Sequence, residues 1–181
     1  MKDKRKRDRH VLVSIVMGSD SDLNTMCEAA NILRELRIPF EVTITSAHRS
    51  PSLTRRYIRE LNDKGVKLVI AGAGLAAHLP GAIASETILP VIGVPMETKS
   101  LSGQDSLYSI VQMPAGVPVA TMAIGKPGAK NAALLASEIL ALSNKEIAKR
   151  LMNWRKVQES CVQKKSTRLK KLGYEKYMEA K

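Results

Sequence analysis

Apolar and amphipathic stretches alternate along most of this chain. The first apolar run is nearly continuous over residues 11–17, as expected for a strand buried on both faces of a parallel sheet. Over residues 22–37, apolar positions recur at steps of three and four, which predicts an amphipathic helix. We expect Ser21 or Asp22 to cap this helix and Pro39 to mark its end.

The same alternation continues along the chain. Further strands are predicted at 40–45, 67–71, 90–94 and 117–123, and helices at about 52–64, 104–112, 128–142 and 144–158. A Gly/Ala-rich segment separates the third strand from the fourth. The helix at 128–142 is rich in alanine and leucine, which indicates close packing, with another subunit as one candidate partner. This order of elements predicts the α/β class, with a parallel sheet and helices on both faces.

A chain of 181 residues with 44% hydrophobic content can form one domain with a sizeable core. We expect this domain at 10–159, between a basic N-terminal tail at 1–9 and a basic C-terminal extension at 160–181. These two ends hold +9 of the net charge of +12. Charged ends poor in aromatic residues are typical of solvated or flexible segments. The charge therefore argues against nucleic-acid binding as the main function, although non-specific binding by the ends stays open.

Cysteine and histidine are too sparse for a metal centre. Cys27 and Cys161 are too far apart for a disulfide framework or a zinc site, which fits a reducing compartment. His10, His48 and His78 are scattered, so we predict no metal and no cofactor. The chain shows no signal-peptide pattern and no run of roughly 18 apolar residues. We expect a soluble, cytoplasmic protein with no membrane association.

The segment Thr45–Pro51 places a histidine beside an arginine between a predicted strand and a predicted helix. Ser50 and Pro51 are typical of a helix cap and first helical residue, so His48 follows the carboxyl end of a strand, where parallel sheets bind ligands. Histidine exchanges a proton near neutral pH, with an ordinary pKa of about 6.5. Arg49 could hold a phosphate with its planar guanidinium. The alternative to an active site is that His48 and Arg49 are two solvated side chains on the surface.

A second polar turn, Gly18–Asp22, joins the first predicted strand to the first helix. Glycine permits a tight turn, the backbone N–H groups at a helix start attract an anion, and two serines add donors. We interpret this turn as a phosphate cradle, in which the Asp22 carboxylate is better suited to accept hydrogen bonds from sugar hydroxyls. An ordinary capped helix start is the alternative.

The segment Gly72–Ala77 formally matches the dinucleotide fingerprint G-x-G-x-x-G/A. The match is weak, because it follows the third strand and because residues 78–81, with a proline, interrupt the expected pyrophosphate-binding helix. Small residues would instead let the backbone approach a flat ligand, with His78 nearby as a site residue or a structural histidine. An incomplete P-loop at Gly125-Lys126 argues against an ATPase, and the lack of a G-x-S-x-G elbow argues against a serine hydrolase.

Four motifs occur in order within residues 11–157. They are Met17–Asp22, Ser46–Pro51, Gly72–Gly81 and Gly103–Pro114. Together they closely resemble the 5-(carboxyamino)imidazole ribonucleotide mutase family. The resemblance implies a flavodoxin-like, three-layer α/β/α fold, a homo-octamer, and an isomerase of de novo purine biosynthesis that acts on a ribonucleotide. It also implies functional coupling to an ATP-dependent carboxyaminoimidazole ribonucleotide synthetase.

Carried over position by position, the resemblance assigns the catalytic role to His48. The expected substrate-binding residues are Ser19, Ser21, Asp22, Ser46, Arg49, Gly72, Ala73, Gly74 and His78. Leu75 departs from the glycine expected in this loop, so a side chain must be accommodated there.

Two alternatives remain at this stage. One branch of the family carboxylates aminoimidazole ribonucleotide directly with carbon dioxide, and its histidine is typically followed by lysine. Arg49 and the Ala76-Ala77-His78 sequence favour the mutase branch instead. The second alternative is a non-catalytic nucleotide-binding module that docks on nucleic acid through its basic ends.

Overall fold

Five parallel strands form the central sheet in the order β2-β1-β3-β4-β5. This computed structural model describes residues 11–180, so the predicted tail at 1–9 lies outside the described residues. The strands are β1 Val13–Met17, β2 Phe40–Ile44, β3 Leu68–Ala73, β4 Val91–Pro95 and β5 Ala120–Thr121. All residues of β1, β3 and β4 are buried, because helices cover both faces of the sheet.

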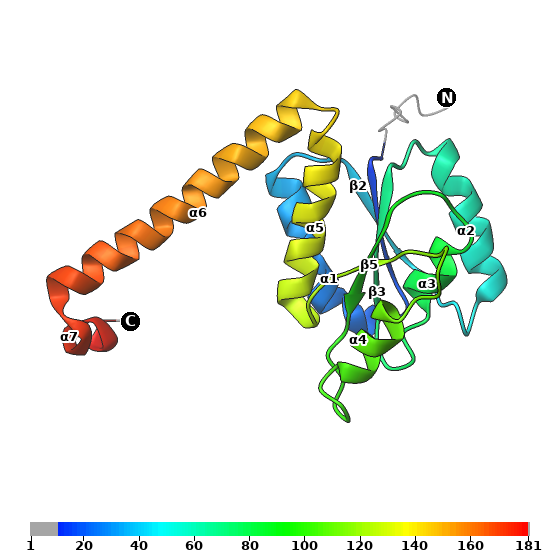
Figure 1. Ribbon diagram of the computed structural model, residues 1–181, viewed down its shortest axis with the longest axis horizontal. Coiled ribbons are helices and arrows are strands. Elements are labelled where there is room, and N and C mark those ends of the chain that lie inside the picture. Colours follow the sequence, from blue (N-terminus) through cyan, green and yellow to red (C-terminus); the bar gives the residue numbers. More distant parts are fainter. Residues whose placement is uncertain (1–10, 181) are drawn as a thin grey trace, which may run out of the picture.

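Two groups of helices enclose the sheet (Figure 1). One face carries α1 Leu23–Glu35 and α5 Gly125–Ala141, and the other carries α2 Pro51–Asp63, α3 Leu79–Ala84 and α4 Gln104–Val111. A separate hydrophobic core fills each space between sheet and helices. The predicted three-layer α/β/α arrangement is confirmed.

The alanines of α5 pack within the domain. Ala129, Ala132, Ala133 and Ala136 are fully buried in the core that α5 shares with α1 and the sheet. Small side chains let the two helices approach each other closely. The close packing predicted from the alanine content is therefore found inside this chain.

Two elements differ from the sequence prediction. The strand predicted at 117–123 shrinks to two residues of β5, because Pro118 has no N–H for the ladder and only Ala120 and Thr121 pair with β4. The region expected to lack a helix after His78 forms the short α3. Pro80 is tolerated there because the first turn of a helix does not use its backbone N–H groups.

The start of the first helix also differs. Residues Asp20–Asp22 form a 3₁₀ turn, η1, that precedes α1. Ser19 caps this turn by accepting a hydrogen bond from the backbone N–H of Ser21 at 3.3 Å, and Asp22 makes no side-chain capping bond to α1. Asp22 is therefore the N-cap residue of α1, one of the two predicted positions, but the side-chain capping bond comes from Ser19 and is made to the preceding 3₁₀ turn.

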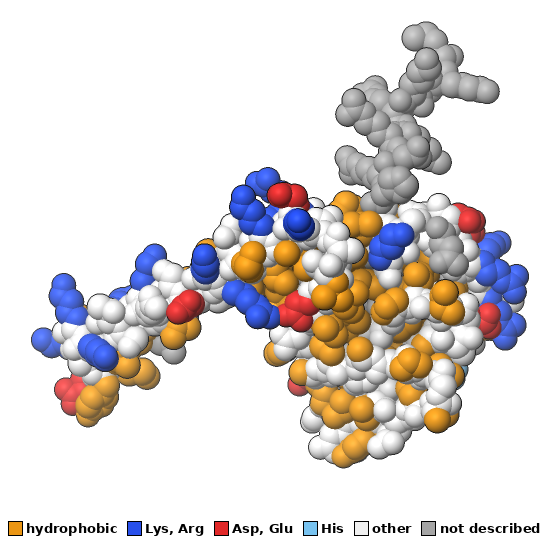
Figure 2. Space-filling view, turned by 45° about the horizontal axis from the view of Figure 1, so that its top comes forward, with side chains coloured by type: hydrophobic (Ala, Val, Ile, Leu, Met, Phe, Trp, Pro, Cys, Tyr) orange, Lys and Arg blue, Asp and Glu red, His pale blue; other side chains and the backbone are white. Residues whose placement is uncertain are grey.

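A long helix, α6 Lys145–Leu172, leaves the domain and ends at the short α7 Tyr174–Glu179 (Figure 1). Asn144 caps it by accepting hydrogen bonds from the N–H groups of Glu146 and Ile147, both at 3.1 Å. Only Ile147 and Leu151 are buried in α6. The C-terminal extension is thus a solvated helix that bears many Lys and Arg side chains (Figure 2). Within the described residues, no helix is both long and apolar enough to cross a membrane.

A polar cluster fastens α2 to the first two strands. The Tyr57 hydroxyl lies 2.7 Å from Ser14 Oγ of β1 and donates to the Glu41 carboxylate of β2. Lys64 Nζ lies 3.1 Å from Glu41 Oε1 and 4.7 Å from the centre of the Tyr57 ring. Burial, together with the hydrogen bond to Glu41, raises the pKa of Tyr57 to about 12. The cluster fixes the middle and the C-terminal end of α2 against β1 and the start of β2.

We expect this cluster to make stability fall at alkaline pH. The folded-state pKa of Tyr57, about 12, lies above the ordinary 10.0, so its contribution to the free energy of unfolding is fully present below pH 10 and is lost as pH rises through 12. Tyr57→Phe should lose about 1–2 kcal/mol at pH 8, because Ser14 is left without its partner. Urea denaturation from pH 8 to 11.5 should show a shallower alkaline decline for the variant. Parallel pH profiles for the two proteins would contradict this.

Candidate active site

A cavity of about 700 Å³ lies at the carboxyl edge of the sheet. Four loops line it: residues 18–22 after β1, 46–49 after β2, 73–79 after β3 and 96–100 after β4. The chain passes from β1 outward to β2 and then returns across β1 to β3. This change of direction opens a crevice between the loops, which is where open α/β sheets bind ligands.

The cavity brings together nine of the ten site residues predicted from the sequence. These are Ser19, Ser21, Asp22, Ser46, His48, Arg49, Ala73, Gly74 and His78. The tenth, Gly72, is buried in β3 behind the cavity wall. A Cβ at Gly72 would lie 2.5 Å from Met26 Sδ and 2.8 Å from Met96 Cε, so a larger residue would require these two methionine side chains to shift. Gly72 does not line the cavity.

His48 and His78 face each other across the cavity. Their ring centroids are 5.6 Å apart and their planes are inclined by only 16°, which is a stacked arrangement. His48 comes from the loop after β2 and His78 from the end of the loop after β3, so the two loops meet through these rings. The stacking places the two imidazole rings side by side among the cavity-lining residues.

The Arg49 guanidinium bridges the first two loops. Its Nη2 donates to the carbonyl oxygen of Gly18 at 2.9 Å, and the Arg49 backbone N–H donates to Ser46 Oγ at 3.1 Å. Ser50 Oγ accepts from the Ser46 N–H, which closes the turn before α2. A guanidinium has five N–H donors, and the bond to Gly18 uses one, so Arg49 is positioned beside the serine-rich turn with donors left for an anion.

Asp22 occupies an electrostatically unfavourable place. Burial at the cavity wall raises its pKa above the ordinary value, against the lowering effects of the Ser21 hydroxyl, the Ser19 backbone and the Arg49 charge. Ser21 Oγ donates to Asp22 Oδ1 at 3.3 Å. Additional hydrogen-bond donors stabilise the charged form of a partly desolvated carboxylate. A ligand that offers hydroxyl groups would therefore stabilise Asp22.

The loop after β4 was not among the segments that the sequence predicted for the site. Glu97, Lys99 and Ser100 lie at the rim of the cavity, and Met96 forms part of its wall. Thr98 closes this loop, because its Oγ1 accepts from the Gly103 N–H at 3.1 Å and donates to Asp105 Oδ1 at 2.8 Å. A smaller hollow of about 350 Å³ continues from the cavity between this loop and Thr25. Residues 96–100 could have been found from the sequence, because they closely follow the strand predicted at 90–94.

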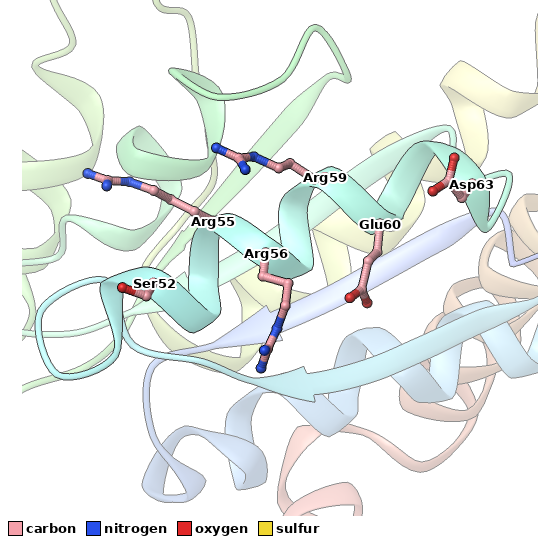
Figure 3. A pocket seen from close by; sticks show the side chains of 6 residues that line it. All are labelled: Ser52, Arg55, Arg56, Arg59, Glu60 and Asp63. Carbon is pink, nitrogen blue, oxygen red and sulfur yellow. The ribbon is translucent and has the colours of Figure 1, made fainter.

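A second hollow, on α2, does not have the features of an active site. Its lining comes from that one helix: Ser52, Arg55, Arg56, Arg59, Glu60 and Asp63. Arg55 and Arg59 extend to one side of the helix, and Arg56 and Glu60 to another (Figure 3). Arg55 is paired with Glu86 at 3.5 Å. These side chains do not converge on a common point, so no ligand site is assigned here.

Metal ligands are not grouped in the described part of the chain. Over residues 11–180, no set of three or more His, Cys, Asp or Glu side chains comes together. Cys27 and Cys161 are both free thiols.

Comparison with known proteins identifies the family. The family model described as AIR carboxylase matches residues 12–160. The chain belongs to the AIR carboxylase family. It is 54% identical over 167 residues to the N5-carboxyaminoimidazole ribonucleotide mutase of Pyrococcus horikoshii, which covers 92% of this chain and 93% of that protein. The mutase of Thermotoga maritima is 51% identical over 169 residues, with 93% and 98% covered.

A solved structure of the family has the same fold. The crystal structure of Treponema denticola PurE superimposes with a TM-score of 0.80 at 30% sequence identity, covering 88% of this chain and 98% of that one. The family and the flavodoxin-like fold inferred from the four motifs are therefore confirmed.

Because the Asp22 carboxylate is partly buried, we expect its charged form to lower the stability of the protein at neutral pH. Because the folded-state pKa is raised, the contribution of Asp22 to stability is present below the ordinary pKa of 3.8 and is lost as pH rises through the folded-state pKa. Asp22→Asn should therefore raise the Tm at pH 7, by about 1 °C for a chain of this size, and the gain should vanish near pH 3.5. Thermal denaturation at both pH values measures this.

The exposed neighbour Asp20 provides the matched control. Asp20→Asn changes the same charge in the same turn and should leave the Tm nearly unchanged. A lower Tm for Asp22→Asn at pH 7, or an equal gain at both pH values, would show that burial of this carboxylate does not govern the effect.

Proposed function

We propose that this chain is an isomerase that converts 5-(carboxyamino)imidazole ribonucleotide into 4-carboxy-5-aminoimidazole ribonucleotide in de novo purine biosynthesis. The observation that carries the proposal is one cavity that holds His48 beside Ser19, Asp22 and Arg49. The relatives from P. horikoshii and T. maritima, which match more than nine-tenths of the chain, are named as mutases of this substrate.

The cavity suits a phosphorylated nucleoside. Its volume of about 700 Å³ falls in the range of roughly 300–1,000 Å³ that small-molecule sites occupy. We assign the phosphate to Arg49, Ser19 and the N–H groups at the start of η1, because these combine a fixed cation with hydrogen-bond donors. Asp22 would accept hydrogen bonds from the ribose hydroxyls, which places the imidazole ring of the substrate toward His48.

His48 can serve both halves of the reaction. In the first half, the bond between the exocyclic nitrogen and its carboxylate carbon breaks, carbon dioxide leaves, and His48 protonates the nitrogen. In the second half, ring carbon 4 forms a bond to carbon dioxide, and His48 takes the proton from that carbon, which restores the aromatic ring. The proton given equals the proton taken, so the reaction needs no redox partner and no other co-reactant.

Retention of carbon dioxide makes the second half efficient. A reactant held beside its nucleophile can gain about 7–11 kcal/mol relative to a bimolecular encounter. Apolar side chains at Ala73, Ala76, Leu79 and Met96 form a large part of the cavity wall. Such a wall offers no hydrogen bond to water and favours a small, uncharged molecule.

We further propose that the enzyme is a cytoplasmic homo-octamer whose substrate is supplied by an ATP-dependent synthetase, with its catalytic domain at 10–159. Exposed apolar side chains support the assembly, since they occur on α4 at Tyr108 and Val111 and on α6 at Met152 and Val157. The charge of the two ends is consistent with solvated extensions.

Replacement of the proposed acid–base group should abolish turnover and preserve binding. We expect His48→Asn to reduce the rate of isomerisation by about 10²–10⁴-fold, with the dissociation constant of the product nucleotide little changed. The measurement supplies the carboxyamino nucleotide to purified protein without ATP and follows the 4-carboxy product. Supplying aminoimidazole ribonucleotide with carbon dioxide in a parallel reaction tests the direct carboxylase. Substantial turnover by His48→Asn would remove this residue from its role.

Loss of the proposed phosphate ligand should act mainly on binding. Arg49→Ala should raise the dissociation constant by about 10–100-fold, the equivalent of one or two charge-assisted hydrogen bonds, and lower kcat less. Calorimetric titration with the product nucleotide measures it. Arg56→Ala is the matched control, because Arg56 is exposed on α2 outside the cavity (Figure 3). Equal affinities for both variants would contradict the phosphate assignment.

A further inference from the structure

Leu75 adopts a backbone conformation that leucine seldom takes. Its φ is +60°, and among the described residues only Arg37 and Ser102 are other non-glycine residues with positive φ. In this left-handed region the Cβ of an L-residue crowds the following carbonyl oxygen, so glycine is strongly favoured. Strain of this kind persists where surrounding structure imposes it, and it is concentrated at functional sites.

Contacts on both sides of Leu75 impose its conformation. The Met96 N–H donates to the Ala73 carbonyl at 2.9 Å, and the His78 N–H donates to the Ala76 carbonyl at 2.7 Å. Ser109 Oγ of α4 lies 3.5 Å from the Leu75 carbonyl oxygen. The loop between β3 and α3 is thus fastened to β4 and α4, and the position of Leu75 follows from these contacts.

The Leu75 side chain stands at the mouth of the cavity. Among the described residues that line it, the other large apolar side chains are buried, with Leu79 3% and Met96 4% exposed, whereas Leu75 is 64% exposed. The exposed residues that line the same cavity also include His48 and Arg49. A positive φ at a leucine is a strained conformation of the kind that persists at functional sites, and here it holds an apolar side chain at the cavity.

We propose that Leu75 covers the mouth of the cavity over the bound nucleotide and retains carbon dioxide between the two halves of the reaction. The inference rests on the proposed isomerase function. Carbon dioxide is uncharged and forms only weak hydrogen bonds, so Arg49 and the serine-rich turn cannot hold it as they hold a phosphate. Only a closed wall can prevent its exchange with the solvent, and an apolar side chain at the mouth also keeps water from the ring carbon.

An isotope experiment tests this role. The unlabelled carboxyamino nucleotide is converted by the full-length protein in buffer that contains ¹³C-labelled carbon dioxide, and the label in the product is read by mass spectrometry, with a reaction lacking enzyme as blank. We expect little label with the wild type. Leu75→Ala and Leu75→Gly should each incorporate at least threefold more label and release more free aminoimidazole ribonucleotide. Ile88→Ala, which truncates an almost fully exposed apolar side chain outside the cavity, should match the wild type.

The two Leu75 variants separate the side chain from the backbone. Both lack the leucine side chain, but only Leu75→Gly also relieves the positive φ, so its Tm should equal or exceed that of Leu75→Ala. Leu75→Met keeps a large apolar side chain and should restore the low labelling. If labelling rises in all three variants, or in only one of the two truncations, backbone geometry is responsible and the inference fails.

Two further outcomes would overturn the proposal. Labelling in Leu75→Ala and Leu75→Gly equal to the wild type would show that the side chain does not retain carbon dioxide. Wild-type product that carries as much label as the medium would show that the cavity is open. If the wild type converts none of the substrate, the proposed function fails and this inference fails with it, a result distinguishable from the others by the absence of product.

Discussion

Parallel pairing of β1 with both of its neighbours is the constraint on which the site depends. β1 pairs along its whole length with β2 on one side and β3 on the other, so the residues that follow Met17, Ile44 and Ala73 emerge at one edge of the sheet. Three loops from distant parts of the sequence thereby meet. The loop after β4 joins them, since β4 pairs in parallel with β3.

The cavity combines two environments, which the proposed reaction would use for different parts of its substrate. On one side, Arg49 crosses from its own loop to the Gly18 carbonyl and brings a cation to the serine-rich turn beside Asp22. On the other side, the wall is largely alanine, leucine and methionine. A sugar phosphate requires the first environment and a small uncharged intermediate requires the second. His48, stacked on His78, lies where the loops that carry the two environments meet.

Stability and site geometry are connected through α2. The Tyr57 cluster fastens α2 to β1 and β2, and Thr45 and Thr54, both buried, join their hydroxyls at 2.8 Å across the start of the same helix. The contact between Thr45 and Thr54 therefore joins the two ends of the loop that carries His48 and Arg49. By contrast, the half-buried carboxylate of Asp22 and the positive φ of Leu75 both lower stability at the cavity itself, as is common in functional sites.

Sequence alone determined the strands, most of the helices and three of the four loops that line the cavity, because hydrophobic periodicity and turn residues act over a few neighbouring positions. It placed His48 and Arg49 at a strand end from Thr45–Pro51, and the family followed from the order of four motifs. Tertiary structure alone decided that His48 stacks on His78, that Gly72 supports the wall from behind, and that residues 96–100 complete the cavity. Those outcomes depend on how distant segments pack against one another, a property that no local pattern of residues encodes.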